Sequence, residues 1–263
     1  MRTSSIRVPM RGAGAIISDA PTIAVHTFTA AVVGVWLIAA HFLPQYLLPG
    51  PLSVGKALKN LCTNWGMLQN ILASAWHVFA ALVSSFVLGS GLALISREVA
   101  SLDVLVTKRI LPFINSFPGV GWAILALMWF GIGSFSVVFT ITLVLTPLAL
   151  INMRAAIDNV DAELSEMAFS FGRKRLNVIR KIVIPSLIPY AFSTFRINFG
   201  TAWKITLTAE LFGGGAGLGY VMNVARQGFD MATIFAIFVV IVLFAVAMEH
   251  LIFRPLQRRL GGA

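Results

Sequence analysis

The sequence is short of charged residues and almost without cysteine. Only 11% of its 263 residues are Asp, Glu, Lys or Arg, whereas an average soluble domain carries roughly a quarter. Hydrophobic residues make up 58% of the chain, and the mean hydropathy is +0.87. Too little polar surface remains to cover a globule, which disfavours a soluble enzyme, and the same composition excludes a disordered chain. We therefore expect an all-α polytopic membrane protein.

Several kinds of chemistry lack the residues they need. The single cysteine, Cys62, allows no internal disulfide and no cysteine-based zinc site. The four histidines have no zinc-ligand spacing, and no serine lies in a nucleophile elbow. The stretch 50–57 fits the first seven positions of a phosphate-binding loop, but Ala57 stands where the hydroxyl that binds Mg²⁺ is required. We expect neither an enzyme nor a metal site, and no cofactor bound by this chain.

Six apolar stretches are candidates for membrane-spanning helices. A bilayer core of ~30 Å needs about 20 apolar residues of helix. The shortest candidate contains Pro147, and the most polar one contains Arg196 and Lys204. We predict a cytoplasmic tail at 1–21, a transmembrane domain at 22–253 and a second cytoplasmic tail at 254–263. The predicted spans are Thr22–Leu43, Ile71–Ile95, Ile110–Phe130, Phe135–Met153, Ser186–Ala209 and Met231–Phe253.

The basic residues predict the orientation in the membrane. Fifteen of the 20 lie in the two termini and in alternate connections, three lie in the opposite connections, and two lie within the fifth span. Lys and Arg concentrate on the cytoplasmic side of membrane proteins. Both termini are therefore expected in the cytoplasm. This distribution explains the net charge of +10 without a nucleic-acid partner.

One outer connection is predicted to form a helix of its own. Apolar residues recur there at steps of four and three, from Val54 to Leu68, with polar residues between them. This spacing is typical of an amphipathic helix lying in the membrane interface.

The cytoplasmic connection at about 154–185 is the one extended hydrophilic segment. It contains Glu166, Met167 and Ala168, then Gly172, and after nine more residues a run that ends at Pro185. This pattern resembles the signature loop of permease subunits from binding-protein-dependent ABC importers. Met167 replaces an alanine of the family pattern, and Ile184 replaces a leucine.

Three further stretches resemble the nitrate/sulfonate/taurine branch of these permeases. They are the proline-rich run Leu47–Val54, the span ending Trp129–Gly133, and Phe195–Met222 with its glutamate and glycine-rich turn. Two positions depart from the branch: His77 stands where arginine is common, and Ile124 where a proline is usual. Lys204 is also not expected from the branch.

The resemblance implies a transmembrane permease subunit of an ATP-driven importer in a bacterial inner membrane. It implies a second copy of the permease, two cytoplasmic ATPase subunits that bind ATP and Mg²⁺, and an extracytoplasmic substrate-binding protein. The solute implied is small and anionic, similar to nitrate, a sulfonate or taurine. A secondary carrier or an intramembrane enzyme without an ATPase partner is the alternative.

The residues of the signature loop fit docking to a soluble partner. Glycine permits a sharp break in the chain and close backbone approach. Apolar residues before Gly172 fall at steps of three, one and three, which gives one face that can bind a partner. The predicted ATPase-coupling residues are Glu166, Met167, Ala168, Phe171 and Gly172.

Ionisable residues at bilayer depth are candidates for the transport pathway. No acidic residue lies one turn from Lys204 on its own helix face, so the ammonium faces either a pathway or a partner elsewhere. Glu210 is a second candidate, although the backbone amides of the glycine turn could instead hold it structurally. Glu249 is expected at the inner interface. Trp203 and Trp122 complete the set of pathway candidates.

Overall fold

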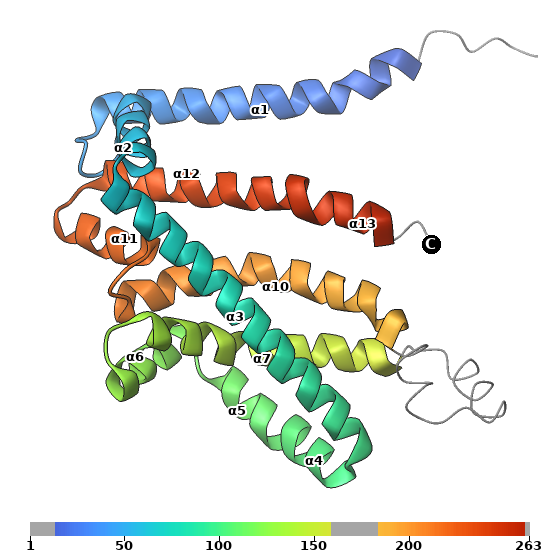
Figure 1. Ribbon diagram of the computed structural model, residues 1–263. Helices are drawn as coiled ribbons and strands as arrows, with labels where there is room; N and C mark the ends of the chain where they lie inside the picture. The colour runs from blue at the N-terminus through green and yellow to red at the C-terminus, as the bar shows by residue number, and fades with distance from the viewer. Residues whose placement is uncertain (1–13, 159–183, 261–263) are drawn as a thin grey trace, which may run out of the picture.

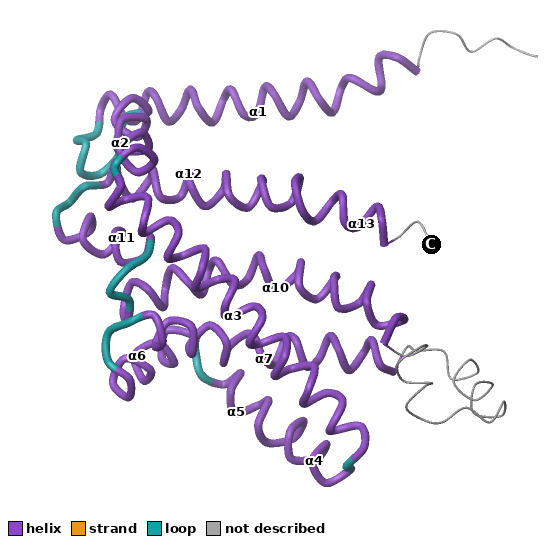
Figure 2. Tube along the Cα trace, in the orientation of Figure 1, coloured by secondary structure: helices purple, strands orange, loops and turns teal. Residues whose placement is uncertain are grey.

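A computed structural model describes residues 14–158 and 184–260, and helices make up almost all of these ranges. Figure 1 and Figure 2 show long helices joined by short loops, with no strand in the ranges described. Bends or chain reversals between neighbouring helices occur at Asn64, Val99, Pro118 and a glycine-rich turn. The helices are α1 (Gly14–Phe42), α2 (Pro51–Thr63), α3 (Trp65–Glu98), α4 (Ala100–Leu105), the π-helical η1 (Val106–Ile110), α5 (Leu111–Ser116), α6 (Gly119–Phe130), α7 (Ser134–Asp158), α10 (Ile184–Gly213), α11 (Leu218–Gln227), α12 (Met231–Met248), the π-helical η3 (Glu249–Phe253) and α13 (Arg254–Leu260).

Four helices are long and apolar enough to cross a membrane, or five if one bent pair forms a single span. The predicted all-α membrane architecture is confirmed, whereas six spans were expected. The difference is the predicted span Ser186–Ala209, which lies inside the 30-residue helix α10. This helix is long enough to cross, but it is not among the four because of its polar residues. The four are Ala24–Phe42, Trp65–Ser96, Ser134–Asp158 and Met231–Arg258.

The predicted continuous span Ile110–Phe130 is wrong. The chain turns by 88° between Ser101–Ser116 and Gly119–Phe130. Pro118 has no backbone N–H to continue a helix, and Phe117 before it is extended with φ −97° and ψ 129°. A residue preceding proline is biased away from the helical region. Hydrophobicity continues across this point although the helix does not.

The predicted amphipathic helix over Val54–Leu68 is also shorter than expected. α2 ends at Thr63, and Asn64 begins α3 by accepting a hydrogen bond from the Gly66 amide at 3.0 Å. Val54 and Leu61 are buried in the hydrophobic core, and α2 packs against α12. Residues 65–68 therefore belong to the next long helix.

The core is built where α3, α7, α10 and α12 meet. α7 contacts both α3 and α10 along its length, and it runs through Pro147 as one helix. Buried side chains such as Leu82, Ile141 and Ile237 come from three different helices. In contrast, none of the apolar stretch Ala24–Phe42 of α1 is buried. Trp36 anchors α1 by donating to the Pro49 carbonyl at 3.2 Å and stacking on Phe235 of α12.

The two ends of the molecule differ in which elements they hold. α2, α11 and the turn between α6 and α7 lie at one end, while α13, the end of α7 and the start of α10 lie at the other (Figure 1). The first described residues of α1 lie on the same side as α13. The arrangement results because the long helices run back and forth between the two ends of the molecule.

Candidate functional site

The predicted ATPase-coupling residues lie outside the described residues. Glu166, Met167, Ala168, Phe171 and Gly172 fall in the range 159–183, between the end of α7 and the start of α10. These flanking helices pack against one another. The coupling role of this segment therefore remains a prediction from its sequence.

Lys204 is exposed on α10, and no acidic side chain within the described ranges forms an ion pair with it. Exposed residues recur along this side of the helix at Ile197, Gly200 and Lys204, at steps of three and four. A side chain at Gly200 would meet no other atom within 4 Å, so this surface is open. Thr208 extends the row and donates to the Lys204 carbonyl at 3.1 Å. We call Ile197, Gly200, Lys204 and Thr208 the α10 stripe.

The two tryptophan candidates lie in the interior of the chain. Trp203 is 3% exposed and packs against Phe244, with ring centroids 5.0 Å apart. Trp122 is 6% exposed, and its indole N–H donates to the Ile114 carbonyl at 3.2 Å. Neither residue shares the exposed α10 stripe with Lys204. The structure therefore does not bring the four pathway candidates together.

Glu210 is fully buried and is held by three residues from two other helices, α3 and α11. Its carboxylate accepts from the Ser74 hydroxyl at 2.7 and 2.8 Å and from the Gly219 amide at 2.8 Å. His77 Nδ1 lies 2.8 Å from the same carboxylate and donates to it when the carboxylate is ionised. The expected contact with a backbone amide of the glycine turn region is present. These contacts are all with protein groups, and Glu210 has no surface exposed to solvent.

Sequence reasoning did not identify the α3 partners of Glu210. Asn70, Ser74 and His77 are spaced by four and three residues, which places them on one face of a helix. A polar row of this kind within an apolar helix predicts an interior polar contact. The spacing was therefore a signal, but it did not identify Glu210, which lies 133 residues from His77, as the partner of Ser74 and His77. It also did not identify the Gly217 amide as the partner of Asn70.

A second charged cluster joins α10 to the end of α12. Arg196 donates through Nε to Glu249 at 3.1 Å and through Nη2 to the other carboxylate oxygen. Its third contact is to Gln257 at 2.6 Å, and Arg254 lies 3.6 Å from Glu249. Arg196 is thus neutralised within the chain, which distinguishes it from Lys204 eight residues further on.

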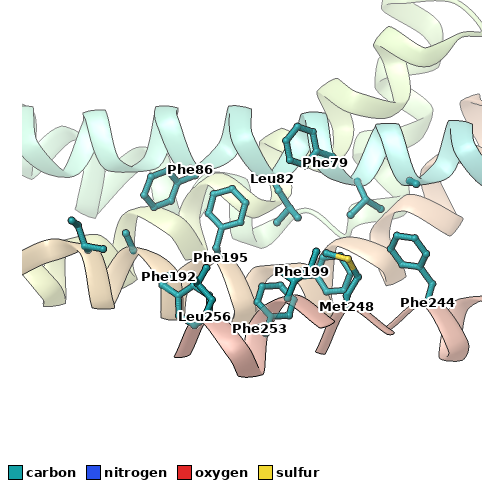
Figure 3. A pocket seen from close by; sticks show the side chains of 15 residues that line it. Phe79, Leu82, Phe86, Phe192, Phe195, Phe199, Phe244, Met248, Phe253 and Leu256 are labelled. Atoms are coloured by element: carbon teal, nitrogen blue, oxygen red, sulfur yellow. The ribbon is translucent and has the colours of Figure 1, made fainter. Parts of the chain in front are cut away.

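An apolar groove of about 740 Å³ lies between α3, α10 and the α12–α13 region. Figure 3 shows its aromatic side chains, with Phe79 and Phe86 on α3 and Phe195 on α10. All of its lining residues are apolar. Recognition of a polar solute requires a few placed polar groups. The groove lacks such groups and does not contain Lys204, so it is not the site we propose for a charged solute.

Comparison with known proteins agrees with this architecture. The chain is 29% identical over 217 residues to a probable ABC transporter permease protein of Brucella melitensis, covering 81% of this chain and 86% of the relative. It is 28% identical to a putative aliphatic sulfonates transport permease of Bacillus subtilis (88% and 84% covered). It is 25% identical to the taurine transport system permease protein of Escherichia coli K12 (93% and 90% covered).

The fold is similar to that of solved importer permeases. A chain of the MetNI methionine ABC transporter, in an inward-facing form, superposes with a TM-score of 0.66 at 16% identity, covering 74% of this chain and 96% of that one. At this identity the likeness concerns the fold alone.

The described ranges form an all-helical membrane protein with four candidate spans, or five if the bent pair is one span. Residues 85–260 match the family described as the inner membrane component of binding-protein-dependent transport systems. The chain belongs to this family. It is a transport permease of the ABC importers and not an enzyme, and ATP hydrolysis belongs to its partner subunits.

Proposed function

We propose that this permease forms the translocation pathway for a small organic or inorganic anion of the sulfonate, taurine or nitrate type. The observation that carries the proposal is Lys204, which is exposed on α10 without an acidic partner in the described ranges. It lies nine residues from the end of α10 at Gly213, or about 14 Å along a helix that rises 1.5 Å per residue. This distance from the helix end supports a position of the ammonium inside the membrane.

An unpaired cation at this depth needs compensation. Transfer of lysine to the centre of a membrane helix costs roughly 3 kcal/mol, so such residues face a partner or a water-filled cavity. The α10 stripe carries small or polar side chains next to Lys204, which suits a hydrated path better than a lipid surface. The names of the sulfonate and taurine permeases that the chain resembles support an anionic solute.

The other subunits of the transporter are inferred from the family. Two copies of the chain face one another across the pathway, two cytoplasmic ATPases bind the segment Glu166–Gly172, and an extracytoplasmic binding protein delivers the solute. Closure of the ATPases moves the coupling segments and shifts the pathway between its two orientations. A ligand drives such a shift only through different affinities for the two states.

The test measures ATP-dependent uptake of radiolabelled taurine and of nitrate into vesicles that contain the full complex. Lys204→Met keeps the apolar stem and removes the charge. It should lower uptake about fivefold or more, because a partly screened ion contact is worth roughly 1–4 kcal/mol. ATP hydrolysis by the assembled complex should persist, and Lys204→Arg should retain uptake.

Lys59→Met is the matched control, because Lys59 is an exposed lysine on α2 far from the α10 stripe. It should transport as the native chain does. Normal uptake by Lys204→Met, or failure of that variant to assemble, would show that Lys204 does not line the pathway. Failure of the native complex to transport either anion would overturn the solute class.

A further inference from the structure

α11 begins without a cap of its own. It follows a turn with glycine at 213, 214, 215 and 217, and its N-cap residue, Gly217, has no side chain to accept a hydrogen bond. The first N–H groups of any helix lack partners within the helix and need acceptors from elsewhere. Such a flexible turn also constrains the direction of the helix very little.

Three acceptors from two other helices supply the missing cap. The Gly217 amide donates to Asn70 Oδ1 at 2.8 Å and the Leu218 amide to Ser74 Oγ at 2.7 Å. The Gly219 amide donates to the Glu210 carboxylate at 2.8 Å. Asn70 and Ser74 belong to α3 and Glu210 to α10. The positive end of the α11 dipole also favours an acidic group at this position.

The capping groups are joined to one another. The Ser74 hydroxyl accepts from Leu218 and donates its single proton to Glu210. His77 binds the same carboxylate from the next turn of α3. Ser74 and Glu210 have no exposed surface, and His77 is 1% exposed. A Cβ placed on Gly217 would lie 2.3 Å from the Glu210 carboxyl carbon, so the carboxylate fills a space that only glycine leaves.

A buried polar network of this kind is an expensive way to gain stability. Replacing a buried ion pair by apolar side chains is often neutral or stabilising, whereas a fully satisfied network fixes one geometry. Here the geometry fixed is the attachment of α11. Apolar burial of Leu218 and Val221 holds the same helix in the core but does not determine its orientation by hydrogen bonds.

We propose that Asn70, Ser74, His77 and Glu210 are positioning residues that clamp α11 to α3 and α10, so that the three helices move as one unit throughout the transport cycle. The proposal depends on the chain being an importer permease. It does not depend on the role of Lys204 or on which solute is carried, because the exchange measurement uses no solute and the hydrolysis measurement does not require its identity.

Amide hydrogen exchange in residues 217–221 tests the clamp. The complex of this chain with its ATPase subunits is placed in nanodiscs and measured without nucleotide and after trapping with ATP and vanadate. In the native complex these amides should exchange slowly, at the same rate in both states. Ser74→Ala leaves the Leu218 amide without its acceptor and removes one of the donors to Glu210, and it should speed exchange roughly tenfold. The increase in exchange rate should also differ between the two nucleotide states, because α11 would no longer move together with α3.

Asn70→Ala removes one hydrogen bond to α11 at a half-buried position, together with a bond to the Gly66 carbonyl within α3. Its effect should be smaller, so it serves as the test variant if Ser74→Ala does not fold. Asn223→Ala is the matched control, because Asn223 accepts only from Arg226 within α11 itself. It should leave exchange at 217–221 unchanged.

A second measurement separates positioning from folding. The binding protein, purified with the ligand it retains, should stimulate ATP hydrolysis several-fold less in Asn70→Ala and Ser74→Ala, with unstimulated hydrolysis unchanged. Native amides that lose protection in one nucleotide state would overturn the proposal, since the clamp would then open. Full stimulation in a variant with fast exchange would overturn it as well.

Discussion

Three charged side chains of α10 meet three different environments. Arg196 is paired with Glu249 and Gln257 near one end, Lys204 is exposed without an ion pair in the described part of the chain, and Glu210 is buried in a hydrogen-bonded cluster. The cost of a charge in the membrane is met locally at the first and last positions. Lys204 has no ion-pair partner among the described residues, so another group must compensate its charge. For this reason Lys204 is the pathway candidate.

Gly217→Ala should destabilise the attachment of α11. Gly217 has φ +110°, where an L-residue is strained by roughly 1–2 kcal/mol. The added Cβ would also displace the Glu210 carboxylate, which would weaken the hydrogen bonds that the carboxylate makes. The combined cost should reach about 2 kcal/mol or more, measured as a lower thermal midpoint of the purified complex.

Gly55→Ala is the control for this variant. Gly55 lies inside α2, and a Cβ there would meet nothing within 4 Å. Alanine is favoured over glycine in a helix interior by up to about 1 kcal/mol, so the midpoint should stay or rise. An equal loss in both variants would contradict the steric argument at Gly217.

At the scale of helices, hydropathy predicted the apolar stretches better than it predicted their breaks. The run Ile110–Phe130 reads as one span because apolar residues continue through Phe117. Its bend depends on the missing N–H of Pro118 and the extended residue before it. Pro147, by contrast, lies within an unbroken helix packed on both α3 and α10. Tertiary packing decides whether the helix breaks at a proline or continues through it. A hydropathy average carries no information about that packing.

The candidate site could also be predicted from the sequence only in part. Lys204 was identifiable because a cation within an apolar run is costly wherever the helix packs. The contact of Glu210 with a backbone amide followed from the glycines near it. Its partners on α3 could not be inferred, because 133 residues separate His77 from Glu210 and the crossing of the two helices brings them together.

Gly172→Val should uncouple the chain from its ATPases while leaving it inserted in the membrane. The sequence of the signature segment predicts a sharp break at this glycine, and a β-branched residue there should cost roughly 1–2 kcal/mol or more. Solute-stimulated ATP hydrolysis should fall, while insertion and copurification of the ATPases are measured alongside. Glu166→Lys should act similarly by reversing the charge shown to the partner. Normal stimulated hydrolysis in Gly172→Val would contradict the docking role.

For the whole molecule, charge and architecture agree on which elements share a side. The basic clusters of the sequence fall in the termini and in alternate connections. The start of α1, the end of α7 and α13 lie at one end of the structure, and α2 and α11 lie at the other (Figure 1). The positive-inside rule assigns the first end to the cytoplasm. The glycine turn and the clamp on α11 would then lie toward the outside.

The single cysteine provides a direct test of this orientation. Cys62 is exposed near the end of α2, and the topology places it outside. A membrane-impermeant maleimide should therefore label the native chain in right-side-out vesicles and fail to label it in sealed inside-out vesicles. Replacing Cys62 with serine and the exposed Arg258 of α13 with cysteine should reverse the pattern, because α13 lies at the opposite end. Labelling of Cys62 only in inside-out vesicles would invert the assignment. The coupling segment would then face away from ATP, and the proposed ATP-driven mechanism would fail with it.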